Sequence, residues 1–269
     1  MRRDAGPDFI EALARGLDVL RCFQPGRPYM TLSEVAAGAQ LARPTARRIL
    51  ITLQQLGYVR SDEAGFSLTP RVLELGMTYI GSQNIWELAG PHLRALVERT
   101  RESCSIAQLD GSDIVYVSRV AMPKLVTLSV TVGTRFPAVQ TSLGKVLLAA
   151  LDGPALDGVL GQPSRSGITP RRRPQRDELD EMLRDVRAKG WAMTDEELAL
   201  GIRSIAAPIR NGQGRTVAAV NVNAHAAETS VDRLVEHHLP LLLRTAGDIS
   251  ADWAAWESRP LATLAPRAG

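Results

Sequence analysis

Four arginines in the first quarter of the chain have the residue type and spacing to bind an anion. The window 35–61 contains no Asp or Glu, but it holds Arg43, Arg47, Arg48 and Arg60. Surface helices usually mix charges, because opposite charges three or four residues apart stabilise each other. Guanidinium groups recognise phosphates and the edge of guanine. The pattern therefore favours an anionic partner over a merely solvated face.

A second candidate is a pair of amides on one strand. The segment "VNVN" places Asn221 and Asn223 on the same face of an otherwise apolar strand, since side chains alternate along a strand. Buried amides are costly unless they are hydrogen-bonded, so a polar ligand would satisfy them; a solvent-exposed face is the equal alternative. Ser204 and the step "TSL" at 141–143 are further candidates, because a helix N-terminus favours a carboxylate.

Patterns typical of catalysis or metal binding are missing from the sequence. The segment 139–146, "VQTSLGKV", lacks the first glycine of a phosphate loop and the Ser or Thr after Lys145. "GQGRTV" lacks the third glycine of a dinucleotide fingerprint, and no G-x-S-x-G elbow occurs. The four histidines and two cysteines have no ligand spacing, and the cysteines are expected to be free thiols. We expect no catalytic residue, no metal and no cofactor.

Composition and charge narrow the class of protein. The chain has 269 residues, of which 45% are apolar and 23% charged, which is typical of a packed globular protein. The net charge of +3 is too small to indicate nucleic-acid binding by itself, so that argument depends on local clustering. No apolar run approaches the ~18–20 residues needed to span a membrane, and no signal segment precedes the first helix. We expect a cytoplasmic protein.

Helical periodicity predicts a small helical unit at the N-terminus. The first expected helix covers residues 9–23, and its apolar stripe consists of Phe9, Leu13, Leu17, Leu20 and Phe23. A short second helix begins at Thr31, which can form a capping box with Glu34, and it ends at Gly38.

The third expected helix carries the arginines. It has Pro44 in its first turn, where a missing N–H costs nothing, and it ends at Gly57. Its apolar stripe consists of Ala46, Ile49, Leu50, Leu53 and Leu56. Residues 58–69 follow as a hairpin around Asp62–Gly65. This order of elements predicts a winged helix-turn-helix over residues 1–69.

The rest of the chain predicts a linker helix at 70–85 and a second domain at 86–258. Strands are expected at 103–109, 113–120 and 124–132, helices at 141–151 and 176–190, a strand hairpin at 204–225, and a long helix at 230–256. "TDEEL" at 194–198 is typical of a helix start capped by Thr194 or Asp195. The tail 259–269 is expected to be disordered. The fold class is α+β, and the second domain is more typical of a small-molecule sensor than of an enzyme.

Three segments together resemble the IclR family of bacterial transcriptional regulators. They are "LSEVAAGAQLARPTARRILITLQQLGYV", "TSLGKVLLA" and "DEELALGIRSIAAPIRNGQGRTVAAVNVNAH". The resemblance runs from about Glu11 to Trp256, and it implies a winged helix-turn-helix followed by a GAF-like effector domain with an antiparallel sheet. It also implies a homodimer, or a dimer of dimers, that binds a palindromic double-stranded DNA operator.

The resemblance assigns an effector pocket to nine positions. These are Leu125, Leu128, Phe136, Ser142, Leu143, Thr194, Ser204, Asn221 and Asn223. In the member that senses glyoxylate and pyruvate, the counterpart of Thr194 is acidic, that of Ser204 is cysteine and those of the asparagines are serines. The pattern "SIAAPI…AAVNVNAH" is more similar to the subgroup that controls the β-ketoadipate pathway, so we expect a small organic acid of aromatic-acid breakdown such as protocatechuate or 4-hydroxybenzoate.

The expected DNA contacts lie on the second and third helices and on the hairpin: Thr31, Ser33, Arg43, Pro44, Thr45, Arg47, Arg48 and Arg60. The third helix would enter the major groove, while Arg60 and Thr31 would hold the DNA backbone. RNA polymerase is a further candidate partner, and no membrane partner is expected. Three alternatives stay open: an enzyme with a regulatory helix-turn-helix, a protein–protein adaptor, and a regulator that senses a short keto acid.

Overall fold

The computed structural model describes residues 6–24, 26–82, 85–123, 130–169 and 172–258. The chain forms two compact units, Met1–Ser82 and Gln83–Gly269, which we describe separately. The expected fold class, α+β with an antiparallel sheet in the second unit, is confirmed. Among the described residues, no helix combines the length and the apolar character needed to cross a membrane.

The first unit packs three helices against a three-stranded sheet. Its elements are α1 (Glu11–Cys22), β1 (Tyr29–Met30), α2 (Leu32–Gly38), α3 (Arg43–Gln55), β2 (Val59–Asp62) and β3 (Gly65–Leu68). The antiparallel sheet has the order β1-β3-β2, and Asp62 pairs with Gly65 at the tip of the expected hairpin. The fully buried residues at the centre of its core are Val19, Val35 and Leu50.

Local chemistry fixes how α2 and α3 are joined. The expected capping box is present: the Glu34 N–H donates to Thr31 Oγ1 (3.3 Å), and the Thr31 N–H donates to Glu34 Oε2 (2.8 Å). Gln40 then adopts φ 55°, a left-handed conformation that reverses the chain within one turn. Pro44 lies in the first turn of α3, as predicted. The two helices are thereby held in a helix-turn-helix arrangement.

The apolar stripe predicted for the first helix is only partly buried within the chain, where Leu20 and Phe23 pack against the core. Ala14 and Val19 are the buried residues of α1, whereas Phe9, Leu13 and Leu17 are exposed. A 3.6-residue period marks an apolar face but does not say what covers it. The same correction applies to Leu56, which follows α3 and is about half exposed.

A helical segment follows the hairpin. A short 3₁₀ turn, η1 (Pro70–Val72), leads into α4 (Leu73–Ser82). The exposed apolar side chains of α4 are Leu73, Leu75, Met77 and Tyr79. This helix covers most of the linker helix that was expected at 70–85.

The second unit is built on one antiparallel sheet with the order β6-β5-β4-β9-β8-β7. Its strands are β4 (Ser103–Asp110), β5 (Asp113–Val120), β6 (Arg135–Pro137), β7 (Ala192–Asp195), β8 (Ile202–Arg210) and β9 (Thr216–His225). Its helical elements are α5 (Ile85–Thr100), η2 (Ala138–Gln140), α6 (Ser142–Ala149), α7 (Gly153–Leu160), α8 (Arg176–Lys189), α9 (Val231–Arg233), η3 (Leu234–His238) and α10 (Leu239–Glu257).

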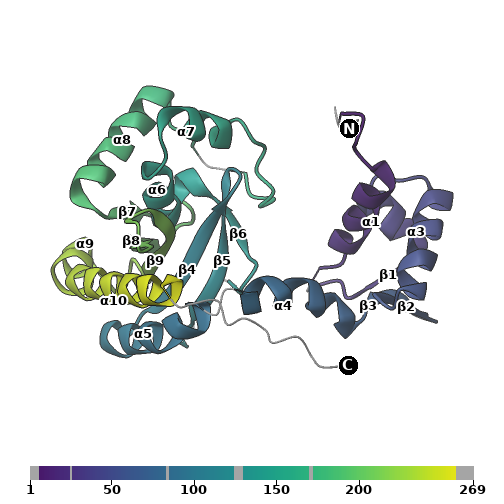
Figure 1. The fold of residues 1–269 in the computed structure, drawn as a ribbon, viewed down its shortest axis with the longest axis horizontal. Coiled ribbons are helices and arrows are strands. Elements are labelled where there is room, and N and C mark those ends of the chain that lie inside the picture. The colour runs from purple at the N-terminus through teal and green to yellow at the C-terminus, as the bar shows by residue number, and fades with distance from the viewer. Residues whose placement is uncertain (1–5, 25, 83–84, 124–129, 170–171, 259–269) are drawn as a thin grey trace. The chain divides into compact units, whose positions relative to one another are not determined.

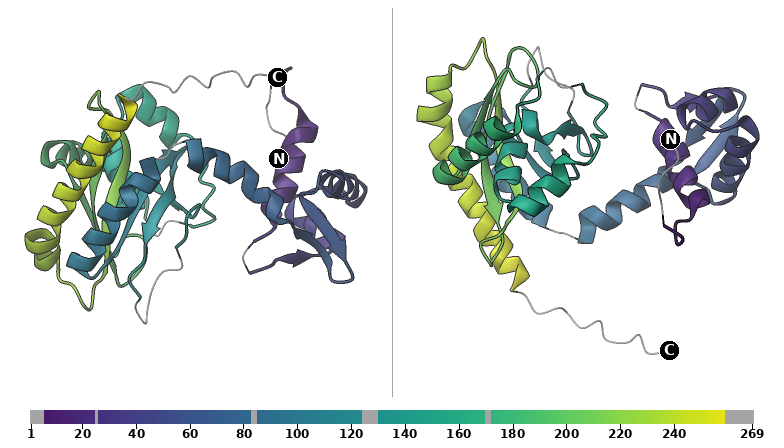
Figure 2. Two further views of the ribbon diagram at one scale, coloured as in Figure 1. Left: turned by 60° about the horizontal axis from the view of Figure 1, so that its bottom comes forward. Right: turned by 90° about the horizontal axis from the view of Figure 1, so that it is seen from above.

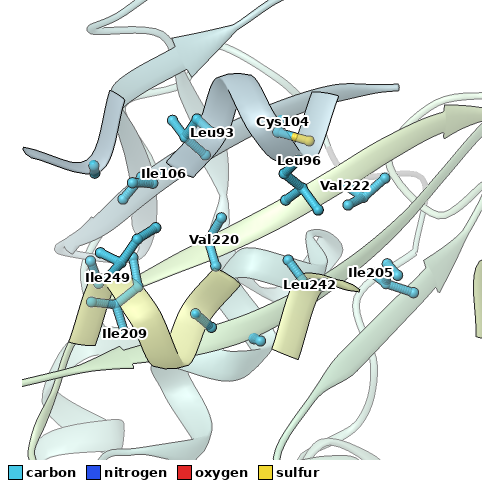
Figure 3. Close-up of a cluster of buried hydrophobic side chains, with 14 of the residues drawn as sticks. Leu93, Leu96, Cys104, Ile106, Ile205, Ile209, Val220, Val222, Leu242 and Ile249 are labelled. Atoms are coloured by element: carbon cyan, nitrogen blue, oxygen red, sulfur yellow. The ribbon is translucent and has the colours of Figure 1, made fainter. Parts of the chain in front are cut away.

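Helices cover both faces of this sheet (Figures 1 and 2). On one face α5 and α10 enclose an apolar core, in which Leu93, Leu242 and Ile249 meet Ile106 and Val220 (Figure 3). On the other face α6, α7 and α8 enclose a second core. Successive residues of β9 alternate between the two cores, because side chains point to opposite sides of a strand. The sheet therefore carries two buried faces with different compositions.

The structure corrects part of the sequence-based prediction for this unit. Of the strand expected at 124–132, residues 124–129 lie outside the described part, and 130–132 are not a strand; the edge strand is β6 instead. Thr194 and Asp195 do not cap a helix, because they end strand β7. The sequence analysis also missed α7, whose N-cap Asp152 accepts a hydrogen bond from the Ala155 N–H. The tail expected to be disordered, 259–269, lies outside the described residues.

The start of α6 depends on a close backbone approach. A Cβ added to Gly144 would lie 2.0 Å from the Ala138 carbonyl oxygen and 2.4 Å from the Ala138 Cα. Thr141 caps the same helix by accepting from the Gly144 N–H (3.0 Å). Only glycine therefore permits η2 and α6 to pack as they do.

We predict that Gly144→Ala destabilises the second unit by about 3 kcal/mol or more, because backbone atoms cannot move aside as a flexible side chain can. Urea unfolding followed by tryptophan fluorescence measures this, since all four tryptophans lie in the second unit. The control is Gly158→Ala in α7, where nothing lies within 4 Å of the added Cβ. An equal effect of both changes would contradict the packing argument.

Candidate functional site

The residues expected to bind DNA gather at the start of α3 and on the hairpin. Arg43, Pro44, Arg47 and Arg48 are exposed, and Thr45 is half-buried. No acidic residue occurs in the first turn of α3, so its N-terminal N–H groups and the arginines add to one positive region. The buried positions Ala46, Leu50 and Leu53 attach the opposite face of α3 to the core.

These residues divide between two flanks of α3. Arg47 lies seven residues before Gln54 and so shares its face, and Gln54 Nε2 donates to Ser61 Oγ (3.3 Å) on the hairpin. Thr45 and Arg48 instead border an apolar groove between α1 and α3. The flank with Arg47 therefore faces the hairpin, and the flank with Thr45 and Arg48 faces α1.

Two of the expected backbone contacts have defined partners. Arg60 on β2 donates from Nε to Ser67 Oγ (3.0 Å) and from Nη2 to Tyr29 OH (3.4 Å). The exposed guanidinium is thus held at the root of the hairpin. The hydroxyl of Thr31 is engaged with Glu34 in the capping box, whereas Ser33 is exposed on α2. Thr31 therefore presents less free hydrogen-bonding capacity than the sequence suggested.

A cavity lies on the α6 side of the large sheet. Its lining includes seven of the nine positions expected for an effector pocket: Phe136, Ser142, Leu143, Thr194, Ser204, Asn221 and Asn223. The other two, Leu125 and Leu128, lie outside the described residues. The lining also includes Thr141, from the candidate step at 141–143, and residues that the sequence analysis did not select: Tyr116, Val130, Gln140, Leu198 and Ile202.

Strand register explains how the polar members meet. Ser204 on β8 pairs with Thr194 on β7 and with Asn223 on β9, so these three side chains form one row across the sheet. Asn221 lies two residues before Asn223 and therefore on the same face. The prediction that both asparagines share a face is confirmed, and this face is not the solvent-exposed one, since Asn221 is only 3% exposed.

The buried polar groups satisfy one another through a hydrogen-bonded chain. Ser142 Oγ and Ser204 Oγ lie 2.8 Å apart, and Asn221 Nδ2 donates to Ser204 Oγ (3.0 Å). At its other side Asn221 Oδ1 accepts from the Ser105 N–H (3.1 Å). The chain links α6 to three strands, β8, β9 and β4. A buried amide is tolerated here because both of its ends have partners.

Aromatic rings bound the apolar part of the cavity. Tyr116 and Phe136 meet edge to face, with ring centroids 5.8 Å apart, a geometry that favours aromatic packing. Burial raises the pKa of Tyr116 to about 12, so its phenol is neutral at pH 7. The described residues that line the cavity carry no formal charge.

The cavity is narrow, and the loop between β7 and β8 forms part of its wall. Its volume is about 20 Å³, room for roughly one water molecule. Leu198 in this loop is a lining residue. The residue before it, Glu197, accepts from Lys145 Nζ on α6 through both carboxylate oxygens (2.6 and 2.8 Å). The Lys145 side chain is almost fully buried, whereas that of Glu197 is 39% exposed. This ion pair holds the loop against α6.

Comparison with known proteins identifies the family. The model described as the bacterial transcriptional regulator IclR C-terminal domain matches residues 77–251, and that of the IclR helix-turn-helix domain matches residues 12–63. The chain belongs to the IclR family of bacterial transcriptional regulators. The resemblance seen in the sequence is therefore confirmed, and the IclR helix-turn-helix match contains α2, α3 and the start of the hairpin.

Relatives within the IclR family carry informative names. The chain is 37% identical to the Pca regulon regulatory protein of Pseudomonas putida, over 90% of this chain and 84% of that protein. It is 34% identical to the p-hydroxybenzoate hydroxylase transcriptional activator of Acinetobacter baylyi, over 90% and 91%. A crystal structure of an IclR homologue from Microbacterium hydrocarbonoxydans in complex with 4-hydroxybenzoate is similar with a TM-score of 0.77 and 25% identity, covering 91% of this chain and all of that one. These names agree with the subgroup expected from the sequence.

Sequence reasoning missed two further polar groups beside the IclR-type pocket. Gln140 donates from Nε2 to the Arg172 carbonyl (3.1 Å), while its buried Oε1 has no partner among the described residues. Arg119 on β5 pairs with Ser105 on β4, and Ser105 pairs in turn with Asn221 on β9. The alternation of "YVSRV" marks a strand but does not tell which face is lined by a cavity. The described residues contain no cluster of His, Cys, Asp and Glu suited to a metal ion.

Proposed function

We propose that this IclR-family regulator binds a hydroxylated aromatic acid, or a dicarboxylic product of its breakdown, in the second unit and operator DNA through the first. The observation that carries the ligand class is the neutral chain Ser142–Ser204–Asn221, set beside the rings of Tyr116 and Phe136 in one buried cavity. Hydroxyl and amide groups suit a phenol or a carboxylate, and the rings suit an apolar ring.

The residue types also argue against a very small ligand. A two- or three-carbon keto acid offers little apolar surface to Tyr116 and Phe136, and the hydrophobic contribution scales with the apolar area removed from water. The 4-hydroxybenzoate complex of the Microbacterium homologue and the name of the Acinetobacter activator support an aromatic acid.

Ligand entry requires the cavity to open. Its volume of about 20 Å³ is far below the ~300–1,000 Å³ of typical ligand sites. The partly exposed Glu197 can exchange Lys145 for water, which would release the β7–β8 loop and Leu198. A ligand that binds the open form better than the closed form shifts this equilibrium, and such a shift is the simplest route to regulation.

We predict that the purified protein is stabilised against heat by an acid of this class. The panel is 4-hydroxybenzoate, protocatechuate, β-ketoadipate, pyruvate and glyoxylate in a thermal-shift assay. A ligand that binds only the folded state adds about 2.7 kcal/mol at a hundredfold excess over its Kd. Shifts with pyruvate or glyoxylate alone would contradict an aromatic effector and favour the short keto acid.

Two variants test whether the ligand binds in this pocket. Asn221→Ala should remove the shift, whereas Ser118→Ala, on the strand β5 but facing the other side of the sheet, should keep it. An unchanged shift in the Asn221 variant would remove this residue from the pocket.

The DNA-binding half of the proposal depends on charge and shape. The exposed arginines of α3 have no acidic residue in that first turn to neutralise them, and Arg60 is held on the neighbouring hairpin by Ser67 and Tyr29. In this proposal Arg43 and Arg47 read or approach the major groove, while Arg60 and Ser33 hold phosphates. The IclR helix-turn-helix match supports this assignment.

We predict that Arg47→Ala weakens binding to an operator selected from random duplexes. Removing this positive charge from the DNA interface should also lower the slope of log K against log salt, by up to about 0.9. Electrophoretic mobility at several salt concentrations measures this. Arg184→Ala, an exposed arginine of α8, is the matched control and should leave both quantities unchanged. A salt-independent wild-type affinity would contradict DNA binding and favour the adaptor.

Self-association is the third part of the proposal. The exposed apolar side chains of α1 and the facing residues of α3 form one groove whose apolar walls are Leu13, Leu17, Leu20, Ile49 and Leu56. Patches of this kind mark interaction sites, because isolated exposed apolar residues rarely line up along a helix. We assign this groove to a second copy of the chain, so that a homodimer would present two copies of α3 to a palindromic operator.

We predict that Leu13→Glu converts the dimer to a monomer, because the isologous interface would bury the new charge in both copies. Sedimentation velocity measures the mass. Leu200→Glu, at an equally exposed leucine of the second unit, is the control and should not change it. A dimer that persists in the Leu13 variant would place the interface elsewhere.

A further inference from the structure

Arg119 is a cation on the cavity side of the sheet. It pairs with Ser105 of β4, and Ser105 pairs in turn with Asn221 of β9, so the three residues form one row across adjacent strands. Ala107, two residues after Ser105, belongs to the core beneath α6, which fixes the side of the sheet to which this row points. The backbones of Arg119 and Asn221 are therefore two strand spacings apart, ~9.6 Å, and the guanidinium reaches Ser105, the residue that lies between them in this row.

The contacts of Arg119 leave its charge unneutralised. Nη1 donates to Ser105 Oγ (2.9 Å), and the buried Nε has no hydrogen-bond partner among the described residues. The described part of the chain supplies no carboxylate for an ion pair to it. Arg135 on the neighbouring strand β6 shows the usual solution, since it forms ion pairs with both Asp110 and Asp113.

Electrostatics at this position favour an incoming anion. Burial lowers the pKa of Arg119. The groups that raise this pKa are the hydroxyl of Tyr116 and the thiol of Cys104. Both of those groups are neutral at pH 7, because burial raises each pKa to about 12. A half-buried cation with neutral neighbours is costly, and a bound carboxylate would offset that cost through charge-assisted hydrogen bonds.

We propose that Arg119 binds the carboxylate of the effector, with the apolar part of the ligand against Tyr116 and the Ser142–Ser204–Asn221 chain receiving its other polar end. This inference rests on the proposed function, because it names the residue that recognises the acid in the same pocket. The described lining of the cavity is uncharged, so Arg119 is the group beside it that can distinguish a carboxylate from its neutral amide.

The test compares two ligands of nearly equal shape, 4-hydroxybenzoate and 4-hydroxybenzamide, by isothermal titration calorimetry with the full chain. The wild type should prefer the acid. In Arg119→Gln the affinity for the acid should fall about tenfold to a hundredfold, the range expected for a hydrogen bond to a charged group, while the affinity for the amide stays the same. Arg215→Gln, an exposed arginine in the β8–β9 turn, removes the same charge and should retain the preference.

Two further measurements distinguish a role of Arg119 in carboxylate binding from a role in folding. Arg119→Lys keeps the charge but loses the planar fork, so it should bind the acid with an intermediate affinity. Without ligand, Arg119→Gln should melt no lower than the wild type, because it removes an uncompensated cation, whereas a purely structural arginine would lower the melting temperature when replaced.

The outcomes distinguish this inference from the function on which it rests. A wild type that binds the acid, with an Arg119→Gln variant that keeps the preference over the amide, would overturn the role of Arg119 and leave the aromatic effector in place. If Arg119→Gln does not fold, Arg119→Met takes its place, because it also removes the charge while keeping an unbranched side chain, and a full wild-type preference in that variant overturns the role equally. A wild type that binds neither compound nor the other aromatic acids would overturn both.

Discussion

The second unit depends on one constraint: polar side chains buried in a sheet must find partners inside the protein. Ser204 and Asn221 lie on central strands, where water cannot reach them. An unsatisfied buried group costs about 1–3 kcal/mol, a large part of the net stability of a domain. The serine at the start of α6 supplies one partner and the backbone of β4 another. The position of α6 is therefore set by a polar requirement as well as by apolar packing.

Because of this requirement the two faces of the sheet have different roles, one in stability and the other in the proposed ligand binding. The face beneath α5 and α10 is mostly apolar, with Val220 and Val222 pointing into it on either side of Asn221 in the chain (Figure 3). That face can supply stability, because nothing on it needs a ligand. On the face beneath α6, hydroxyl and amide side chains occupy positions that apolar side chains occupy on the other face. Gly144 makes this arrangement possible, since the close approach of α6 to Ala138 positions Ser142 over the strands.

The sequence carried enough information for most of the elements and for the middle of the pocket. Capping residues, Pro44 and the turn glycines fixed the helices of the first unit, and strand alternation put Asn221 and Asn223 on one face. The sequence does not show which other element, or which other molecule, packs against a given apolar face. The stripe through Leu13 and Leu17 has the same period as a core helix, yet it is exposed in the single chain. Thr194 shows the complementary failure, because its capping chemistry suits a helix start while strand pairing with Ser204 decides its conformation.

Arg119 could not have been selected from the sequence for a related reason. Its position on β5 is clear, but its importance depends on the lack of a neighbouring acid among the described residues, and that is a property of the folded sheet. Arg135 is just as prominent in the sequence and is neutralised by two aspartates. The difference between the two arginines is the difference between a charge that stabilises the fold and one held ready for a partner.

The closed cavity also sets how a ligand can act. A protein whose pocket is open only part of the time binds with an apparent Kd raised by the reciprocal of the open fraction. The Lys145–Glu197 ion pair and the self-satisfied Ser204–Asn221 chain both favour the closed form. A ligand that separates this chain must replace its protein–protein hydrogen bonds, and only a molecule with a polar group facing Ser204 and Asn221 can do so without leaving them unpaired. A closed pocket with internal hydrogen bonds thus acts as a filter, because apolar compounds of similar size would open it without supplying the missing partners.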